Sequence, residues 1–329
     1  MGSAQIENEF RARRWLRGGH QQTLAAFFLQ RQLHLAPPEE RLIEVESGIK
    51  VLCHCHWQPN RSEALTVIVV HGLEGSSDSS YAVGVAAKGL AAGMNVVRMN
   101  QRNCGGTDAL APTLYHSGRS GDVAEVAHTL IRDCKLSRIA LAGFSMGGNL
   151  VLKLAGEWGR SAPTEFRGVV GVCPAVDLGP SADALHTPSN RVYEIYFLWK
   201  LRRRLRDKAR HFPDHFDVAR ARGLRSLREF DDKITAHYCG FSGAQDYYER
   251  SSASRVLEHI AVPALILHAG NDPFIRITPE TRAKIAANPN ISFVESHDGG
   301  HCSFLAAPDG YDGRWAERRV VEFLQRLPA

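Results

Sequence analysis

The sequence predicts an α/β fold, in which a mostly parallel β-sheet is flanked by helices and interrupted by a helical cap insertion. Three observations support this class. Short β-branched runs alternate with longer segments of helical periodicity, the order found when helices cover a parallel sheet. The run LTVIVV at 65–70 is apolar except for Thr66, as expected of a strand buried on both faces. The run RIALA at 138–142 leads directly into a glycine-rich turn and then a helical segment.

In chain order, strands and helices alternate regularly over the first half of the sequence. The strand at 65–70 is followed by an alanine-rich segment at 81–92, predicted as a helix, and by a strand NVVRM at 95–99. Apolar residues recur at a helical period in 122–134, which predicts the next helix. The later expected elements are strands at 138–142, 168–173, 264–268 and 291–294 and helices at 149–158 and 313–325.

The alternation breaks after Asp177. Residues 180 to about 255 contain few strand signals and many arginine and aromatic residues, which predicts a helical insertion. We therefore expect a core formed by residues 1–177 and 256–329, and a cap formed by residues 178–255.

Aromatic side chains gather at the start of this insertion. Tyr193, Tyr196, Phe197 and Trp199 are spaced so that most of them share one helix face. That face either packs against the body of the protein or lines an apolar pocket, and both interpretations stay open from the sequence. On the second interpretation, Phe197 and Trp199 are the substrate-binding candidates.

A basic run follows the aromatic residues. It consists of Lys200, Arg202, Arg203, Arg204, Arg206, Lys208 and Arg210. We interpret the run as a solvated helix face, with weak contact to anionic lipid surfaces through 200–210 as the alternative.

Composition restricts the class of protein. The hydrophobic fraction of 44% and the charged fraction of 23% over 329 residues exclude disordered, collagen-like and coiled-coil classes. A net charge of +5 is too small for this length to indicate a nucleic-acid partner. Seven cysteines are too few for a disulfide scaffold. Because no apolar stretch is long enough to span a membrane and charges interrupt the N-terminal segment, we expect a soluble, cytoplasmic enzyme.

The strongest local motif is Gly143-Phe144-Ser145-Met146-Gly147, a G-x-S-x-G sequence between a predicted strand and a predicted helix. This context is typical of a nucleophile elbow, a tight turn that exposes a serine hydroxyl at a helix N-terminus. Glycines are needed there because a Cβ beside the strained turn would clash. We identify Ser145 as the nucleophile, against the alternative of an inert serine in a structural turn.

A serine hydroxyl becomes nucleophilic when a base removes its proton, so a carboxylate and a histidine should follow in the sequence. Asp272 comes after the predicted strand at 264–268, and His301 comes after the strand at 291–294. Both therefore fall at the carboxyl edge of the sheet, where Ser145 also lies and where open α/β sheets bind their ligands.

Three residues are alternatives to this pair. His268 lies within its strand, and His297 follows the last strand almost immediately, whereas Gly299-Gly300 gives His301 a backbone that can approach the site closely. Asp177 is the alternative acid, but it follows an earlier strand than hydrolase acids usually do.

Attack of a serine nucleophile on a carbonyl group also needs an oxyanion hole, which is formed by two backbone N–H donors. Met146, the residue after the nucleophile, supplies one of them. We assign the other to Leu73, in the loop His71-Gly72-Leu73-Glu74-Gly75 that follows the first apolar strand. The alternative for this loop is a plain glycine-rich turn.

We interpret the cysteines discussed below as structural residues rather than metal ligands. Cys53-His54-Cys55-His56 has the residue types of a metal site, but a strand would place its cysteines and histidines on opposite faces. Its spacing also differs from the usual C-x₂-C pattern. Cys104 and Cys302, beside the site loops, are interpreted as small packing residues. We therefore expect no metal and no organic cofactor.

Segments along most of the chain resemble those of a known group of proteins. The matching segments are GHQQT (19–23), HGLEGSS (71–77), NQRNCGG (100–106), YHSG (115–118), GFSMGGN (143–149), FDDKIT (230–235), GFSGAQDYY (240–248), GNDPF (270–274) and GGHCSF (299–304). They resemble the α/β-hydrolase superfamily, and within it the branch of bacterial hydrolases, plant embryogenesis-associated hydrolases and yeast medium-chain ethyl ester synthase/esterases. The resemblance implies a Ser145/Asp272/His301 triad with Leu73 and Met146 as oxyanion donors.

The chain departs from that branch at two positions. Asn103 stands where the branch usually has glycine, and asparagine is the residue that next best tolerates a positive φ. Ser303 stands where the branch has glycine after the His-Cys pair.

The expected activity is hydrolysis of short- to medium-chain acyl esters through an acyl-serine intermediate. The partner is thus a small-molecule acyl ester. Two alternatives are an acyltransferase that passes the acyl group to an alcohol and a non-catalytic binding protein of the same fold. The complete set of Ser145, Asp272 and His301 argues against the binding protein.

Overall fold

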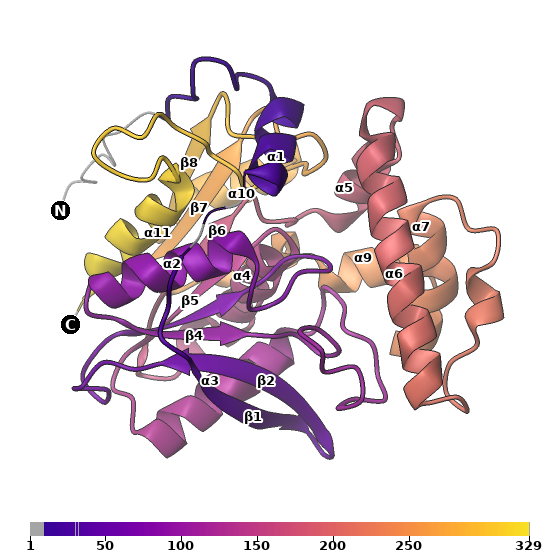
Figure 1. Ribbon diagram of the computed structural model, residues 1–329, viewed down its shortest axis with the longest axis horizontal. Coiled ribbons are helices and arrows are strands. Elements are labelled where there is room, and N and C mark those ends of the chain that lie inside the picture. Colours follow the sequence, from indigo (N-terminus) through magenta and orange to yellow (C-terminus); the bar gives the residue numbers. More distant parts are fainter. Residues whose placement is uncertain (1–9, 30, 32, 329) are drawn as a thin grey trace.

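The computed structural model describes residues 10–29, 31 and 33–328. A twisted sheet with helices on both sides occupies the left of Figure 1, and a group of helices stands beside one edge of the sheet on the right. The strands are β1 (Glu39–Glu46), β2 (Ile49–His56), β3 (Thr66–Val70), β4 (Asn95–Met99), β5 (Ile139–Phe144), β6 (Phe166–Val172), β7 (Ala264–Ala269) and β8 (Ile291–Ser296). The α-helices are α1 (Gly19–Phe28), α2 (Ser80–Ala91), α3 (Ser120–Cys134), α4 (Met146–Trp158), α5 (Leu178–Leu185), α6 (Arg191–His211), α7 (Leu227–Phe230), α8 (Ala236–Cys239), α9 (Ala244–Ser251), α10 (Pro279–Ala287) and α11 (Trp315–Gln325).

The sheet is mostly parallel, as predicted. Its strand order is β1-β2-β4-β3-β5-β6-β7-β8. The pairs from β4 to β8 are parallel, whereas β1 pairs antiparallel with β2 and β2 pairs antiparallel with β4. The hairpin of β1 and β2, helix α1 and helix α10 are additions to the predicted element list, although residues 53–56 do lie in a strand.

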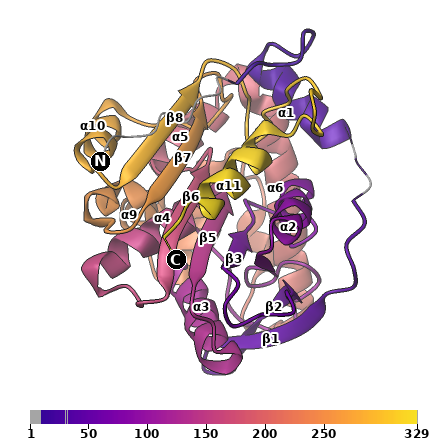
Figure 2. The ribbon, with the colours of Figure 1, turned by 90° about the vertical axis from the view of Figure 1, so that its left-hand side faces the viewer.

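The two faces of the sheet hold separate hydrophobic clusters. In β3, Val67 and Val69 pack with α2 and α11 on one face, and Ile68 and Val70 pack with α3 and α4 on the other. This alternation follows from the two-residue period of a strand. Figure 2 shows α2 and α11 lying together along one side of the sheet.

Among the helices in the described ranges, none is both long and apolar enough to cross a bilayer.

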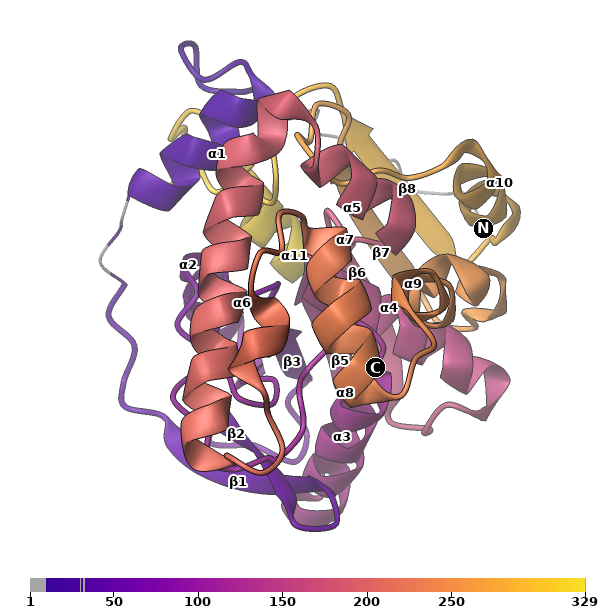
Figure 3. The ribbon, with the colours of Figure 1, turned by 90° about the vertical axis from the view of Figure 1, so that its right-hand side faces the viewer.

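The chain between β6 and β7 forms the helices α5 to α9, which stand in front of the sheet edge in Figure 3. A π-helical segment, Asp231–Thr235, joins α7 to α8. Such segments are rare and often occur at functional sites.

The basic run at 200–210 is not a uniformly solvated face, which corrects the interpretation from sequence. Lys208 is fully buried, and its Nζ donates 2.9 Å hydrogen bonds to Asn103 Oδ1 and the Asp108 carbonyl. Arg204 also turns inward, and its guanidinium donates to the Glu74 carboxylate. These two cations join α6 to loops of the core, whereas Arg203, Arg206 and Arg210 remain exposed.

Candidate active site

The turn at Ser145 connects β5 to α4, as the G-x-S-x-G motif predicts. Ser145 has φ 55° and ψ −120°, a strained conformation for a residue with a side chain. A Cβ at Gly143 would lie 2.1 Å from the Gly147 carbonyl oxygen, and one at Gly147 would lie 2.2 Å from that of Val70. Both positions therefore need glycine, and the turn projects the serine hydroxyl from the end of the strand.

Ser145, His301 and Asp272 form one hydrogen-bonded chain. Ser145 Oγ lies 2.9 Å from His301 Nε2, and His301 Nδ1 lies 2.8 Å from Asp272 Oδ2. The three side chains come from the carboxyl ends of β5 and β7 and from the loop after β8, so residues far apart in sequence meet at one sheet edge. This geometry allows the imidazole to accept the serine proton while the carboxylate fixes the ring tautomer.

Asp272 is buried and held in place by the backbone around it. Its Oδ1 accepts hydrogen bonds from the N–H groups of Phe274 and Ile275, at 3.1 and 2.9 Å. Burial alone would raise the pKa of Asp272, but the neighbouring His301 and the hydrogen bond from the Ile275 N–H outweigh it and lower the pKa below its usual value. The carboxylate is therefore ionised at neutral pH.

The imidazole of His301 has a pKa above its ordinary value. Burial opposes protonation of the ring, but the adjacent Cys302 and Asp272 favour the charged form and raise the pKa. A base with a raised pKa binds the serine proton more strongly during the reaction. The ring also packs against Phe274, with the two ring centroids 4.4 Å apart.

None of the three alternative residues hydrogen-bonds to Ser145, His301 or Asp272 among the described residues. Asp177 accepts hydrogen bonds from Thr278 N–H and Thr281 Oγ1, at 2.8 and 2.9 Å, and so supports the start of α10. His268 is buried within β7. The side chain of His297 is 98% exposed.

Leu73 and Met146 lie beside Ser145, on the wall of the same pocket. The N–H groups on either side of Leu73 are occupied: Gly72 N–H donates to Tyr81 Oη at 2.9 Å and Glu74 N–H to Tyr115 Oη at 3.0 Å. Before Met146, the Ser145 N–H donates to the Val172 carbonyl at 2.9 Å. The N–H groups of Leu73 and Met146 have no acceptor among the described residues. Two unpaired backbone donors next to a nucleophile are what an oxyanion hole requires.

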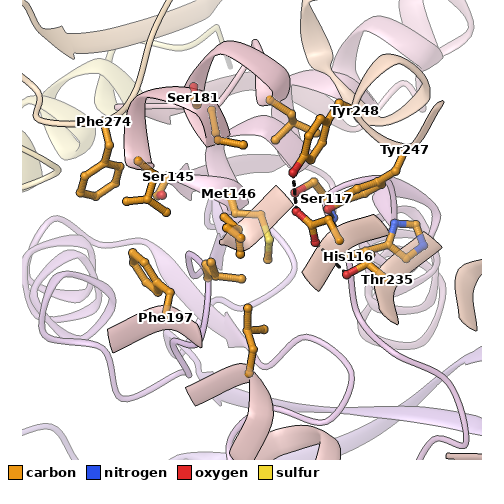
Figure 4. A pocket seen from close by; sticks show the side chains of 18 of the residues that line it. His116, Ser117, Ser145, Met146, Ser181, Phe197, Thr235, Tyr247, Tyr248 and Phe274 are labelled. Atoms are coloured by element: carbon orange, nitrogen blue, oxygen red, sulfur yellow. Dashed lines mark hydrogen bonds between the residues drawn. The ribbon is translucent and has the colours of Figure 1, made fainter. Parts of the chain in front are cut away.

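A narrow pocket of about 100 Å³ extends from Ser145 beneath the cap. Figure 4 shows Phe197 and Phe274 on the Ser145 side of this pocket and Tyr247, Tyr248 and Thr235 on the far side. The wall near the nucleophile is mostly apolar. At the far side Asp231 accepts hydrogen bonds from Thr235 and Tyr248, and burial raises the pKa of this carboxyl to about 6.

A wider cavity of about 830 Å³ also contains Ser145 and His301. Its rim is formed by residues of α1 and α6, including Phe27, Phe28 and Tyr196, and Phe27 packs edge to face against Tyr196. The nucleophile thus lies where a narrow pocket meets a broad one. Phe197 lines both spaces, whereas Trp199 is 51% exposed and lies in a separate hollow with Ile195 and Arg206.

Helix α1 supports the site in a way that the sequence reasoning missed. Thr23 Oγ1 accepts a 2.9 Å hydrogen bond from the His301 N–H. Gln22 is buried, and its side-chain amide binds the backbone of Leu305 twice. Nε2 donates to the Leu305 carbonyl, and Oε1 accepts from the Leu305 N–H. The motif GHQQT at 19–23 was the available signal, although the resemblance assigned it no role.

Comparison with known proteins gives concordant results. A family profile described as alpha/beta hydrolase fold matches residues 66–308. The chain is 31% identical over 323 residues to a protein of Escherichia coli (strain K12) named "Putative esterase YheT", with 96% of this chain and 93% of that protein covered. It is 28% identical over 265 residues to a protein of Bos taurus named "Phospholipase ABHD3". That match covers 80% of this chain and 64% of the bovine protein, slightly less than two thirds of its length.

Among solved structures, an esterase of Pyrococcus furiosus, Pf2001, superposes with a TM-score of 0.57 at 18% identity. The match covers 89% of this chain and 93% of that one. At this identity the likeness establishes a shared fold.

Proposed function

The chain belongs to the family of proteins with the α/β hydrolase fold, and from this premise we propose that it is a serine esterase that cleaves short- to medium-chain acyl esters through an acyl-serine intermediate. The observation that supports the proposal best is the hydrogen-bonded chain from Ser145 Oγ to His301 and on to Asp272. A binding protein without catalysis would not need this arrangement beside two unpaired backbone N–H groups.

In the proposed reaction, Ser145 Oγ attacks the ester carbonyl carbon while His301 Nε2 accepts its proton. The carbonyl oxygen becomes an oxyanion, which the N–H groups of Leu73 and Met146 stabilise. When the C–O bond breaks, His301 returns the proton to the leaving alcohol. Water then attacks the acyl-serine by the same steps, with His301 again as the base, and releases the carboxylic acid.

The two cavities divide the substrate between them. The narrow, mostly apolar pocket beneath the cap suits the acyl chain, and Phe197 lies on its wall. The broad cavity of about 830 Å³ leaves room for a bulky alcohol group. A lipid ester has this shape, and the name of the bovine relative, a phospholipase, supports this class of substrate.

A lipid surface is also part of the proposal. The exposed side of α6 forms one stripe that is apolar at its start and basic at its end: Val192, Ile195, Tyr196, Trp199, Arg203, Arg206 and Arg210. Phe27 and Phe28 of α1, 60% and 73% exposed, extend its apolar part to the rim of the broad cavity. We propose that this stripe makes weak contact with anionic lipid headgroups, through the arginines within 200–210.

Acyl transfer is the second candidate, because the broad cavity next to Ser145 would admit an alcohol as well as water. The acyl-serine can react with either, and the outcome depends on how well the site excludes water.

We also propose a cytoplasmic location, since the seven cysteines are present as free thiols, as is usual in a reducing compartment.

A fluorophosphonate probe tests the proposal directly. The wild-type protein should be labelled once, at Ser145, and Ser145→Ala should lose both the label and the cleavage of p-nitrophenyl esters. Ester cleavage that survives this substitution would overturn the mechanism. Adding ethanol and separating free acid from ethyl ester by chromatography distinguishes the candidates, because mainly ethyl ester at low millimolar ethanol would favour acyl transfer.

A further inference from the structure

Two thiols lie directly against the catalytic imidazole. Cys173 follows β6, and Cys302 is the residue after His301. One ligand atom of each of the three side chains, both Sγ atoms and a ring nitrogen, lies within 4.8 Å of the other two. Cys302 Sγ is 3.9 Å from His301 Nε2, and the Cys302 N–H points to Cys173 Sγ at 3.4 Å. Both cysteines are free.

The backbone fixes the positions of both thiols. Cys173 and Cys302 have φ values of 41° and 59°, a region that residues with side chains rarely adopt. The Cys173 N–H donates to the Leu267 carbonyl at 2.7 Å, and Phe304 N–H closes the loop around Cys302 by donating to the Gly299 carbonyl at 2.9 Å. The surrounding structure therefore holds the sulfur atoms close together beside the imidazole.

We propose that Cys173, Cys302 and His301 form an inhibitory binding site for a thiophilic divalent cation such as Zn²⁺. Two sulfur ligands and one imidazole nitrogen are a ligand set that Zn²⁺ prefers, with Zn–S distances of about 2.3 Å and Zn–N distances of about 2.0 Å. In a tetrahedral complex these distances separate the ligand atoms by about 3.5–3.8 Å. The observed cluster needs only small side-chain rotations to reach that spacing.

Metal binding would block the reaction because it uses the same lone pair. His301 Nε2 accepts the proton of Ser145 in the free enzyme, and a nitrogen that coordinates a metal cannot accept that proton. Each thiol would release its proton to the buffer as its sulfur binds the cation. Ser145 Oγ or a water molecule would take the fourth position.

The cation could reach this site from solvent. Cys302 and His301 both line the broad cavity that contains Ser145. A second group of donors, Cys173, His268 and Asp272, is buried, and its carboxylate is already engaged by His301 and two backbone N–H groups. In the first cluster only Cys173 is buried, and its two other members line the cavity, so this cluster is the one that a dissolved metal ion would occupy.

Direct binding is measured first, on Ser145→Ala, so that the result does not depend on ester cleavage. Equilibrium dialysis should give one Zn²⁺ per chain, and Co²⁺ should produce the near-ultraviolet charge-transfer absorption of a thiolate ligand. Adding Cys302→Ser or Cys173→Ser should weaken Zn²⁺ binding by at least about tenfold and remove the Co²⁺ band, since each variant loses a sulfur ligand. The matched control is Cys239→Ser, a partly exposed cysteine of α8 outside the cluster, which should leave both signals unchanged.

Inhibition is measured next, on the chain with Ser145 intact and with each rate divided by that variant's own zinc-free rate. Zn²⁺ should inhibit the wild type and Cys239→Ser alike, EDTA should restore both, and the two cluster variants should need at least about tenfold more Zn²⁺. If one cluster variant fails to fold, as judged by circular dichroism, the other decides. Equal Zn²⁺ binding by the control and a folded cluster variant would overturn the proposal, because the metal would then bind elsewhere. Failure of the esterase proposal would leave the dialysis and Co²⁺ results standing.

Discussion

Arg204 of the cap helix α6 donates two hydrogen bonds to the carboxylate of Glu74, with N···O distances of 2.7 and 3.1 Å. Glu74 directly follows Leu73, and its N–H and carboxylate also bind Tyr115 Oη. Glu74 has φ 57°, so the loop turns sharply at this point. The cap therefore fixes the conformation of the loop that supplies one of the two unpaired N–H groups beside Ser145.

This arrangement makes Arg204 a positioning residue with a measurable effect. Arg204→Gln should lower kcat for p-nitrophenyl butyrate by about tenfold, equivalent to about 1.4 kcal/mol of transition-state stabilisation, with a smaller change in KM. Arg203→Gln, a substitution of the exposed neighbour, is the control and should change neither parameter by more than about twofold. A purely structural role would instead lower the melting temperature without this selective loss of kcat.

The triad residues should differ in importance from the alternative acid. Ser145→Ala and His301→Ala should each lower kcat by about 10⁴-fold or more, and Asp272→Asn by a similar or smaller factor. Asp177→Asn removes a carboxylate that supports α10, so it should affect stability more than kcat. Steady-state kinetics on the four purified variants checks the order, and a harmless Asp272→Asn beside a damaging Asp177→Asn would reassign the acid.

The activity should depend on pH through His301. Only the neutral imidazole accepts the serine proton, so kcat/KM should fall as the pH drops below the pKa of His301. Because burial is outweighed by Cys302 and Asp272, that pKa is raised, and the acidic limb should lie above the usual histidine value of about 6.5. In Asp272→Asn the favourable charge is gone, so the limb should move to lower pH. An unchanged limb in that variant would contradict the role given to Asp272.

Substitutions of Phe197 and Trp199, the two cap aromatics chosen from the sequence, should differ in their effect on the preferred acyl length. Phe197→Ala should shift the preferred acyl length while acetyl ester turnover stays within a few fold, because the side chain lines the acyl pocket and the triad is untouched. Trp199→Ala is the matched control on the same helix, and it should leave the preference unchanged because Trp199 lies in another hollow. Initial rates on acetyl to decanoyl p-nitrophenyl esters distinguish the two.

Lipid contact should depend on charge. The protein should sediment with vesicles that contain anionic phospholipid and should be released by high salt. Since each surface arginine contributes about 1 kcal/mol to such binding, replacing Arg203, Arg206 and Arg210 by Ala together should weaken it by at least about tenfold. The proposed role of the three arginines would be excluded if the triple variant bound anionic vesicles as strongly as the wild type. It would also be excluded if the wild type bound neutral vesicles as strongly as anionic ones.

The fold could be predicted from sequence because the central strands are buried on both faces. Their short apolar runs stand out from the helices between them, and the structure confirms the mostly parallel sheet. The β1–β2 hairpin was missed because β1 buries only Ile43 and Val45, and an alternation this short does not stand out from its charged neighbours. Helix α1 has a weak apolar pattern and lies against the loop of His301 by polar contacts, which no local periodicity reveals.

In the candidate site, too, some residues could be predicted from the sequence and others could not. Ser145, Asp272 and His301 could be chosen because each follows a strand, and the carboxyl ends of parallel strands share one edge. Asn103 indeed has a positive φ of 65°, as its place in a glycine position predicts. The burial of Lys208 and the inward turn of Arg204 could not be predicted, because their partners are carbonyls and carboxylates of loops about a hundred residues away. Long-range pairing of this kind has no signature in a local charge pattern.

The contact between Thr23 and His301 spans 278 residues of the chain. Contacts between such distant segments form late, because the intervening chain must first be ordered. During synthesis the segments with Ser145 and the cap emerge before the segment with His301. The nascent chain therefore holds a nucleophile without its base until that last segment has been made, so esterase activity would appear only when the last part of the polypeptide folds back onto the first.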